Sequence, residues 1–245
     1  NNIHDTNGAI ELLKEFDEPC VVVAKHANPC GVGCAPTLYE AYQKAYTSDT
    51  VSIFGGIVAL NRPVDEKTAE EIAKVFLEVI IAPSYSEEAL SVLKQKKNLR
   101  ILCLENISKK LPEGSLDLKK VGGGILIQNY SHDLYNDQEL HCVTLKKPDQ
   151  QQLRDLRFAM KVAKHTRSNA IIIAKDGQTL GIGQGQSSRV QAARIALDAA
   201  KDAAKGAVMA SDAFFPFSDT VSEAAKCGVA AIIQPGGSLK DQESI

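Results

Sequence analysis

The sequence has no tryptophan, few aromatic residues and no marked excess of either charge. Aromatic residues make up 5% of its 245 residues, and 28 Lys and Arg stand against 30 Asp and Glu, for a net charge of −2. The chain therefore lacks the basic excess that attracts nucleic acid or an anionic membrane. Its apolar runs are too short to span a bilayer. These features predict a globular protein with neither a nucleic-acid nor a membrane partner.

The cysteines show no spacing that indicates a disulfide framework. Six of them are scattered along the chain, at positions 20, 30, 34, 103, 142 and 227. The first residues do not form a signal peptide. In a chain of this size without a secretory signal, reduced thiols are the default. We therefore expect a cytoplasmic protein.

Strand and helix signals alternate along the first half of the chain. The apolar, β-branched residues 19–24 predict a buried strand, and amphipathic stretches flank it. We expect helices at 5–18, 37–45, 65–76 and 86–94, and strands at 19–24, 51–60, 78–82 and 99–104. This alternation predicts an α/β layer structure.

The second half has the same rhythm, with no obvious repetition of sequence. Residues 105–120 are charged and irregular, and glycines lead into a predicted strand at 122–128. We expect helices at 149–163, 188–205 and 220–227, strands at 208–210 and 229–233, and a β-hairpin over 169–183 with an Asp176-Gly177 turn. We place the boundary between two sub-domains after residue 135, in a polar stretch.

Residues 25–31, Lys-His-Ala-Asn-Pro-Cys-Gly, follow directly on the strand at 19–24. Pro29 and Gly31 are expected to break the strand. Lys25 and His26 would then stand at a strand end, where open α/β sheets bind their ligands. A histidine that titrates near neutral pH beside a lysine suits proton transfer around a weakly nucleophilic amine. The alternative is a surface lysine beside a hydrogen-bonded histidine at a turn.

Two other interpretations concern short motifs. The glycines of 181–185 lack the G-x-G-x-x-G spacing of a dinucleotide loop and follow a predicted hairpin, so a Rossmann site is not expected there. Cys30 and Cys34 have C-x-x-x-C spacing, whereas zinc deaminases use P-C-x-x-C with H-x-E upstream. Asn28 stands where that glutamate would be, so no zinc is expected.

Four stretches in this order resemble one family. They are residues 25–31, residues 52–61 (Ser-Ile-Phe-Gly-Gly-Ile-Val-Ala-Leu-Asn), residues 166–189 and residues 211–238. Together they resemble the transformylase half of the bifunctional AICAR transformylase / IMP cyclohydrolase family of purine biosynthesis. The resemblance implies two α/β/α sub-domains of the cytidine-deaminase-like fold, at 1–135 and 136–245. It also implies that the cyclohydrolase domain is absent and that the transformylase half is truncated at both ends.

The activity implied by the resemblance is formyl transfer from 10-formyltetrahydrofolate to the 5-amino group of AICAR, which gives FAICAR late in IMP biosynthesis. In that family His26 would accept the amine proton, and Lys25 would stabilise the oxyanion and the leaving group. Asn169 would contact the reacting centre. A non-catalytic remnant that binds nucleotide or folate stays an alternative, and a zinc-dependent deaminase is a more distant one.

The resemblance also assigns ligand positions. It implies that the nucleotide is contacted by Asn2, Gly55, Glu78, Arg189, Phe214 and Pro216, and the folate by Asp219 and Ser238. Some members hold a potassium ion at a place that corresponds to the backbone around Thr166 and Ser168, with Asp212. The family's sites form between two subunits, so a homodimer with shared active sites is expected.

Overall fold

A computed structural model describes residues 2–132, 134–135 and 137–245. The helices are α1 (Asn2–Leu13), α2 (Leu38–Ser48), α3 (Glu66–Ala73), α4 (Glu87–Leu93), α5 (Gln150–Lys164), α6 (Arg189–Ala200), α7 (Asp219–Lys226) and α8 (Asp241–Ser244), with 3₁₀ turns η1 (Asp137–Glu139) and η2 (Lys201–Ala204). The strands are β1 (Cys20–Lys25), β2 (Asn28–Cys34), β3 (Gly56–Leu60), β4 (Leu77–Ala82), β5 (Arg100–Cys103), β6 (Leu116–Val121), β7 (Gly124–Asn129), β8 (Ile171–Lys175), β9 (Gln178–Gly183), β10 (Val208–Ser211) and β11 (Ala231–Ile233). The predicted α/β class is confirmed.

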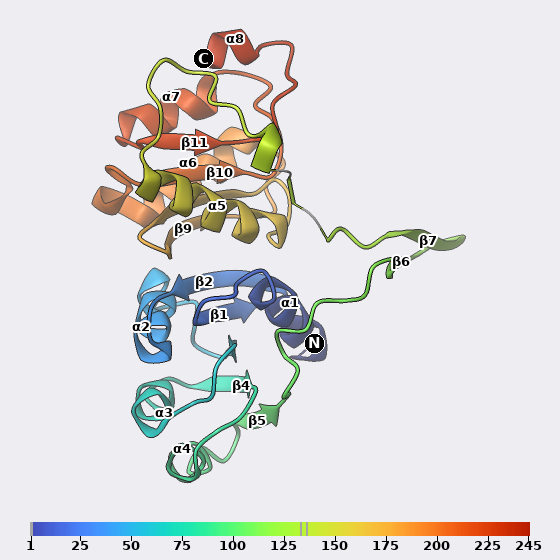
Figure 1. Ribbon diagram of the computed structural model, residues 1–245, viewed down its shortest axis with the longest axis vertical. Coiled ribbons are helices and arrows are strands. Elements are labelled where there is room, and N and C mark those ends of the chain that lie inside the picture. The colour runs from blue at the N-terminus through green and yellow to red at the C-terminus, as the bar shows by residue number, and fades with distance from the viewer. Residues whose placement is uncertain (1, 133, 136) are drawn as a thin grey trace.

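One nine-stranded sheet runs through the molecule in the order β11-β10-β8-β9-β2-β1-β3-β4-β5 (Figure 1). Successive residues of each strand face opposite sides. Val22 and Ile172 pack against α1 and α5 on one face. Val23 packs against α2 to α4 on the other face, and Ile173 packs there against α6 and α7. The result is an α/β/α arrangement in which both faces of the sheet are buried.

The two halves of the sheet have the same topology. The first half runs β2-β1-β3-β4-β5 and the second β9-β8-β10-β11, so β2 and β9 meet at the centre as equivalent antiparallel strands. Residues of the first hairpin recur 150 positions later: Lys25 corresponds to Lys175 and Gly31 to Gly181. The chain therefore contains an internal structural repeat about an approximate twofold axis, whose residue-by-residue correspondence the sequence alone did not reveal.

Paired glycines let the helices approach the central strands. A Cβ on Gly31 would lie 2.1 Å from the Ala45 carbonyl oxygen of α2, and one on Gly181 would lie 1.9 Å from the Ala196 oxygen of α6. Both positions therefore require glycine because the helix backbone rests directly on the strand. This close packing explains why Pro29 and Gly31 lie within β2, although we predicted that they would break the strand.

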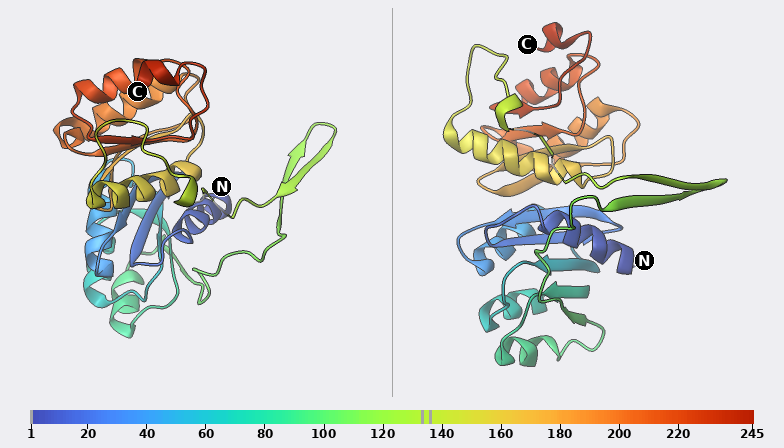
Figure 2. Two further views of the ribbon diagram at one scale, coloured as in Figure 1. Left: turned by 45° about the horizontal axis from the view of Figure 1, so that its top comes forward. Right: turned by 45° about the vertical axis from the view of Figure 1, so that its right-hand side comes forward.

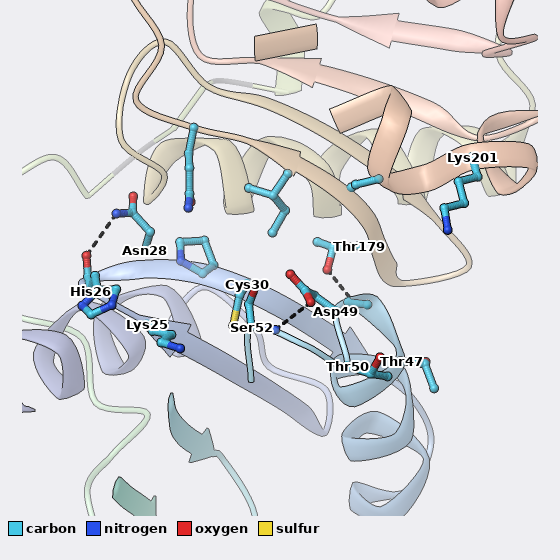
Figure 3. A pocket seen from close by; sticks show the side chains of 16 residues that line it. Lys25, His26, Asn28, Cys30, Thr47, Asp49, Thr50, Ser52, Thr179 and Lys201 are labelled. Carbon is cyan, nitrogen blue, oxygen red and sulfur yellow. Dashed lines mark hydrogen bonds between the residues drawn. The ribbon is translucent and has the colours of Figure 1, made fainter. Parts of the chain in front are cut away.

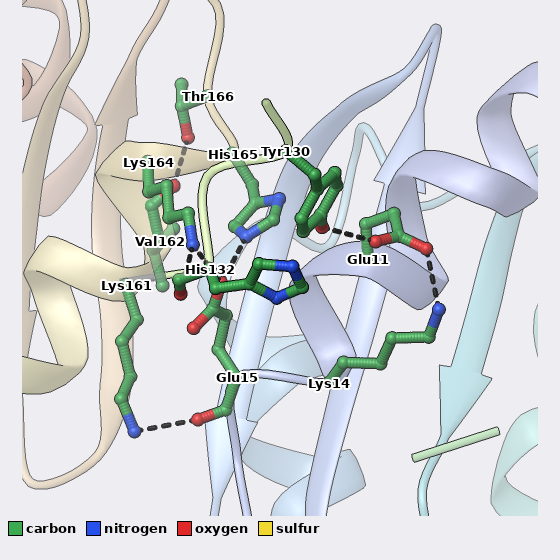
Figure 4. A network of polar contacts seen from close by, with 10 residues as sticks. All are labelled: Glu11, Lys14, Glu15, Tyr130, His132, Lys161, Val162, Lys164, His165 and Thr166. Atoms are coloured by element: carbon green, nitrogen blue, oxygen red, sulfur yellow. Dashed lines mark hydrogen bonds and ion pairs between the residues drawn. The ribbon is translucent and has the colours of Figure 1, made fainter. Parts of the chain in front are cut away.

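An ionic cluster joins the halves on the α1–α5 side (Figure 4). Glu15 and His165 occupy equivalent positions of the repeat, and Nε2 of His165 lies 2.8 Å from Glu15 Oε1. Lys164 Nζ donates to the same oxygen at 2.8 Å. Burial alone would raise the pKa of Glu15, but the bonds from His165 and Lys164 outweigh it and lower that pKa to about 2. Glu15 is therefore an ionised carboxylate that holds the two halves together.

The hairpin β6–β7 projects away from the body in every view (Figures 1 and 2). Its register places Leu116, Leu118, Ile125 and Ile127 on one face, and all four are more than half exposed. Tyr130, at its base, donates to Glu11 of α1 at 2.5 Å. The strand predicted at 122–128 thus belongs to this arm and not to the main sheet, and part of the region expected to be irregular forms its partner strand.

Several predicted boundaries are wrong by a few residues. α1 begins at Asn2 and ends at Leu13, and residues 51–55 form turns before β3. Asp65 caps α3 and Ser86 caps α4, since each side chain accepts a backbone bond from the first turn of its helix. The proposed sub-domain boundary touches residue 136, which lies outside the described residues, and it stays a prediction. None of the described helices is long and apolar enough to cross a membrane.

Candidate functional site

Lys25 and His26 lie at the tip of the β1–β2 hairpin. The two turn residues, His26 and Ala27, both have positive φ, at 54° and 58°. This is the type I′ pattern, which matches the twist of two-residue hairpins but favours Asn and Gly. The turn points the His26 side chain into solvent, whereas Lys25 is half-buried. The turn therefore presents an exposed imidazole next to a partly shielded ammonium.

The loop before β3 lies against this tip. Lys25 Nζ donates to the carbonyl oxygen of Phe54 at 2.9 Å. Gly55, the next residue, has a φ of +70° and donates to the Phe76 carbonyl at 2.8 Å. The contact brings Gly55, a predicted nucleotide contact, next to the predicted catalytic lysine.

A pocket of about 490 Å³ opens beside the hairpin (Figure 3). Lys25, His26 and Asn28 line it from the first half, together with the loop at 47–52, and Lys201 and part of β9 line it from the second half. Charged, hydroxyl and amide side chains line it beside apolar surface. The pocket therefore suits a ligand with both apolar and polar groups that is held between the two halves of the repeat.

Asn169 and Arg189 belong to a second cluster, after the end of α5. Arg189 Nη2 donates to Asn169 Oδ1 at 2.6 Å, and Nη1 pairs with the Asp212 carboxylate. The Asn169 amide nitrogen donates to the Gln186 carbonyl at 2.7 Å. Arg189 is the first residue of α6, so this cluster fixes both the helix start and the Asn169 amide.

Asp212 is the anionic centre of that cluster. Its side chain accepts bonds from Ser168 Oγ, from the Ala170 amide at 3.0 Å and from Arg189. Burial alone would raise the pKa of Asp212, but these bonds outweigh it and hold the pKa below its ordinary value. The carboxylate is therefore ionised at neutral pH and locks Arg189 in place.

The side chains of Thr166, Ser168 and Asp212 are already engaged with protein partners, and the predicted potassium site, which would use the backbone around Thr166 and Ser168, stays a prediction. Thr166 Oγ1 is buried and donates back to Val162 of α5 at 2.8 Å. The Asp212 carboxylate already faces the Arg189 guanidinium, whose charge opposes a second cation. Among the described residues, no group of three or more His, Cys, Asp and Glu side chains could hold a metal ion.

The aromatic segment after β10 divides between core and surface. Phe215 is 2% exposed and packs with α6 and α7, whereas Phe214 and Phe217 are 45% and 54% exposed. Pro216 is exposed as well, and Asp219 begins α7 with its carboxylate bonded to the Thr220 amide at 2.7 Å. The Phe214 ring is available for stacking, as a ligand wall requires, whereas Lys240 Nζ lies over the Phe217 ring, 5.0 Å from its centroid.

Other predicted ligand residues stand apart from these clusters. Glu78 lies on β4 and bonds to Arg100 of β5 at 2.5 Å. Asn2 lies at the start of α1, and Ser238 lies near the chain end, where its amide donates to Asp241. No hydrogen bond or ion pair recorded among the described residues joins these three side chains to Lys25, His26 or Arg189.

The sequence-based list of site residues omitted Asn28. Its side chain bonds both to the hairpin tip and to the segment that precedes Asn169. An amide directly after a predicted turn was the available signal, because Asn side chains commonly bond nearby backbone groups.

Comparisons with known proteins identify the family. The family described as AICARFT/IMPCHase bienzyme matches residues 1–199. The chain is similar over its whole length to proteins called bifunctional purine biosynthesis protein PurH. It is 62% identical to that of Acetivibrio thermocellus, 58% to that of Ruminiclostridium cellulolyticum and 55% to that of Caldicellulosiruptor saccharolyticus. The chain belongs to the AICARFT/IMPCHase bienzyme family.

The chain spans about half the length of these curated relatives, at 48%, 48% and 47%. A solved structure of dCMP deaminase from the cyanophage S-TIM5 is also similar to part of it, at 13% sequence identity and a TM-score of 0.29. That match covers 35% of this chain and 79% of the deaminase. At this TM-score the likeness carries no argument about the fold or the reaction.

Proposed function

We propose that this chain carries the formyl-transfer activity of its family, from 10-formyltetrahydrofolate to the 5-amino group of AICAR. The observation that carries the proposal is the Lys25-His26 tip, which borders a pocket and is bonded through Asn28 to the segment before Asn169. Residues of both halves thus converge on one place. The family relationship supports the same reaction, and a cytoplasmic location would follow from it.

The proposed chemistry needs two proton transfers and the stabilisation of one negative charge. The imidazole of His26 takes a proton from the amine as its nitrogen attacks the formyl carbon. The ammonium of Lys25 stabilises the oxyanion that forms on the formyl oxygen. When the bond from carbon to N10 breaks, the proton that His26 took from the amine passes to N10, and tetrahydrofolate and the formamide are the products. No step passes through a metal ion.

Arg189 and the exposed aromatic residues supply the proposed binding groups. Asp212 and Asn169 already fix the Arg189 guanidinium in the free protein. Arg189 therefore loses little side-chain entropy when a ligand binds to it. Phe214 and Pro216 would form a wall for a flat ring, and Asp219 and Ser238 would lie toward the folate. Asn2, Gly55 and Glu78 complete the proposed nucleotide contacts.

The test is turnover of the purified protein with AICAR and 10-formyltetrahydrofolate, followed by the absorbance of released tetrahydrofolate. We expect release that depends on AICAR and persists in the presence of a metal chelator. A folded sample that binds AICAR in calorimetry but releases no tetrahydrofolate would contradict the proposal and support the binding remnant.

We further propose that the protein forms a homodimer with shared sites. The arm β6–β7 supports this, because its exposed aliphatic face is unusual for an isolated two-stranded ribbon in water. Ile127→Lys should lower the sedimentation coefficient from that of a dimer toward that of a monomer, whereas Gln128→Lys, on the opposite face of the arm, should not. A wild-type protein that sediments as a monomer at high concentration would contradict the dimer.

A further inference from the structure

The two halves meet where β2 lies beside β9, and we call this line of contact the seam. The strands are joined differently at its two ends. At one end Gly33 of β2 pairs with Gln178 of β9, and the Cys34 amide donates to the Gly177 carbonyl at 2.8 Å. The repeat would place an equivalent pair at Asn28 and Gly183, at the other end. Among the described residues, Gly33 with Gln178 is the one strand pair recorded between β2 and β9. The catalytic tip therefore lies at the end of the seam that the backbone ladder leaves open.

At that open end a side chain takes the place of the ladder. Asn28 Nδ2 donates to the His26 carbonyl at 3.1 Å, and Asn28 Oδ1 accepts from the Arg167 amide at 3.2 Å. Arg167 is held in turn by its carbonyl, which accepts from the Gly185 amide at 2.8 Å. One amide group thus connects the turn that bears His26 to the segment that leads into Asn169.

The equivalent side chain in the second half has different partners. Gln178 Nε2 donates to the Lys44 carbonyl at 3.0 Å and to Thr47 Oγ1 at 2.9 Å, both in α2. It makes no bond to its own turn among the described residues. Asn28 and Gln178 both cross the seam, but only Asn28 also fixes a turn carbonyl. The pair is therefore a matched comparison within one molecule.

The turn that Asn28 holds is intrinsically unfavourable. The left-handed region is disfavoured for residues other than glycine, and His26 and Ala27 are both there. The equivalent turn uses Asp176 and Gly177, which tolerate that region well. A turn built from disfavoured residues needs outside contacts to hold it, and such departures cluster at functional sites.

We propose that Asn28 is a positioning residue, which sets the His26 backbone relative to Asn169 by bonding the turn on one side and Arg167 on the other. The proposal rests on the formyl-transfer function proposed above. Asn28 need not touch the substrate. Its role is to hold residues of the two halves at the separation that proton transfer and oxyanion stabilisation require.

The test compares Asn28→Ala with Gln178→Ala. We expect Asn28→Ala to lower kcat about 10- to 100-fold while KM for the nucleotide changes less than about threefold. Gln178→Ala removes a seam-crossing amide of the same kind and should leave kcat within about twofold of wild type. Nuclear magnetic resonance provides a second measurement: Asn28→Ala should shift both the Arg167 amide and the His26 imidazole signals.

Asn28→Asp keeps the oxygen that accepts from Arg167 but cannot donate to the His26 carbonyl. It should therefore retain the Arg167 signal, shift the His26 signal and give an intermediate kcat, and it serves if Asn28→Ala fails to fold. Wild-type kcat in both Asn28 variants, or an equal loss in Gln178→Ala, would overturn the positioning role. If the wild type transfers no formyl group, the proposed function fails without deciding the positioning role. In that case, unchanged His26 and Arg167 signals in Asn28→Ala would still refute the positioning role.

Discussion

The hairpins β1–β2 and β8–β9 are equivalent elements of the two halves, with the same turn geometry and a lysine at the same place. The first turns through His26 and Ala27, and the second through Asp176 and Gly177. The second turn has the residues that its backbone prefers, whereas the first has a titratable ring in a disfavoured conformation. The comparison separates what the fold requires at this position from what the proposed chemistry requires.

At two further pairs of equivalent positions, the charged side chains lie in the second half. Asn61 follows β3 and accepts from the Cys20 amide at 2.8 Å, and Asp212 follows β10 and accepts from the Ala170 amide at 3.0 Å. Leu38 begins α2, in the core, and Arg189 begins α6, paired with Asp212. One half therefore uses an amide and a leucine where the other uses an ion pair. Each half contributes a different part of the candidate site.

The largest effect expected from this comparison is at the two lysines. Lys25→Ala should lower kcat about 10²- to 10³-fold, because it removes the group proposed to stabilise the oxyanion. Lys175→Ala, at the exposed equivalent position, should leave kcat unchanged within error. Steady-state kinetics on both variants measures the difference. Equal losses would show that the lysines act through the hairpin fold and not through the reaction.

The glycines of the central strands should behave alike in both halves. Gly31→Ala and Gly181→Ala each force a Cβ into a helix carbonyl, so each should lower the free energy of unfolding by about 3 kcal/mol. Gly122→Ala is the matched control, because no atom lies within 4 Å of a Cβ at this position in the tip of the arm. It should change the free energy of unfolding by less than about 0.5 kcal/mol. Urea denaturation provides the values. A mild effect at either central glycine would argue against the close helix–strand contact there.

A smaller, pH-dependent effect on stability is expected at Glu15, which meets its equivalent residue His165 near the approximate twofold axis. The pKa of Glu15 lies at about 2 when folded, below its ordinary value of 4.5, so folding favours the ionised form. That contribution, about 2 kcal/mol after allowance for solvent screening, should be complete above about pH 4.5 and be lost as pH falls toward 2. Unfolding measured at pH 7, 4 and 3 should therefore show a steeper acid loss in wild type than in Glu15→Gln. An equal loss of stability with falling pH in both proteins would contradict the claim that ionised Glu15 stabilises the fold.

Local signals in the sequence predicted much of this fold. The β8–β9 hairpin lies where Asp176-Gly177 indicated it, and Asp149 caps α5 with the full capping box. The strand β2 was missed because Pro29, Gly31 and Gly33 are poor strand formers whose place depends on α2 packing against them. The shared rhythm of the two halves was visible in the sequence, whereas their residue-by-residue correspondence came from the strand register of the structure.

The contacts that assemble the site could not be predicted locally. Asn28 bonds a residue that is 139 positions away in the sequence, and Arg189 meets both Asn169 and Asp212 only after α6 has packed on the sheet. Sequence patterns identified Lys25, His26, Asn169 and Arg189 as candidates one at a time. Long-range packing decides which of them are joined, so their partners came from the structure.

The measurement that tests the central claim most directly is formyl transfer in His26→Ala beside Asp176→Asn. The two variants alter equivalent turn positions, and asparagine keeps the left-handed conformation available. Our account predicts that tetrahydrofolate release falls about 10³-fold in His26→Ala, while AICAR binding is retained and Asp176→Asn is fully active. Undiminished release in His26→Ala would contradict the claim that only the first hairpin carries the chemistry.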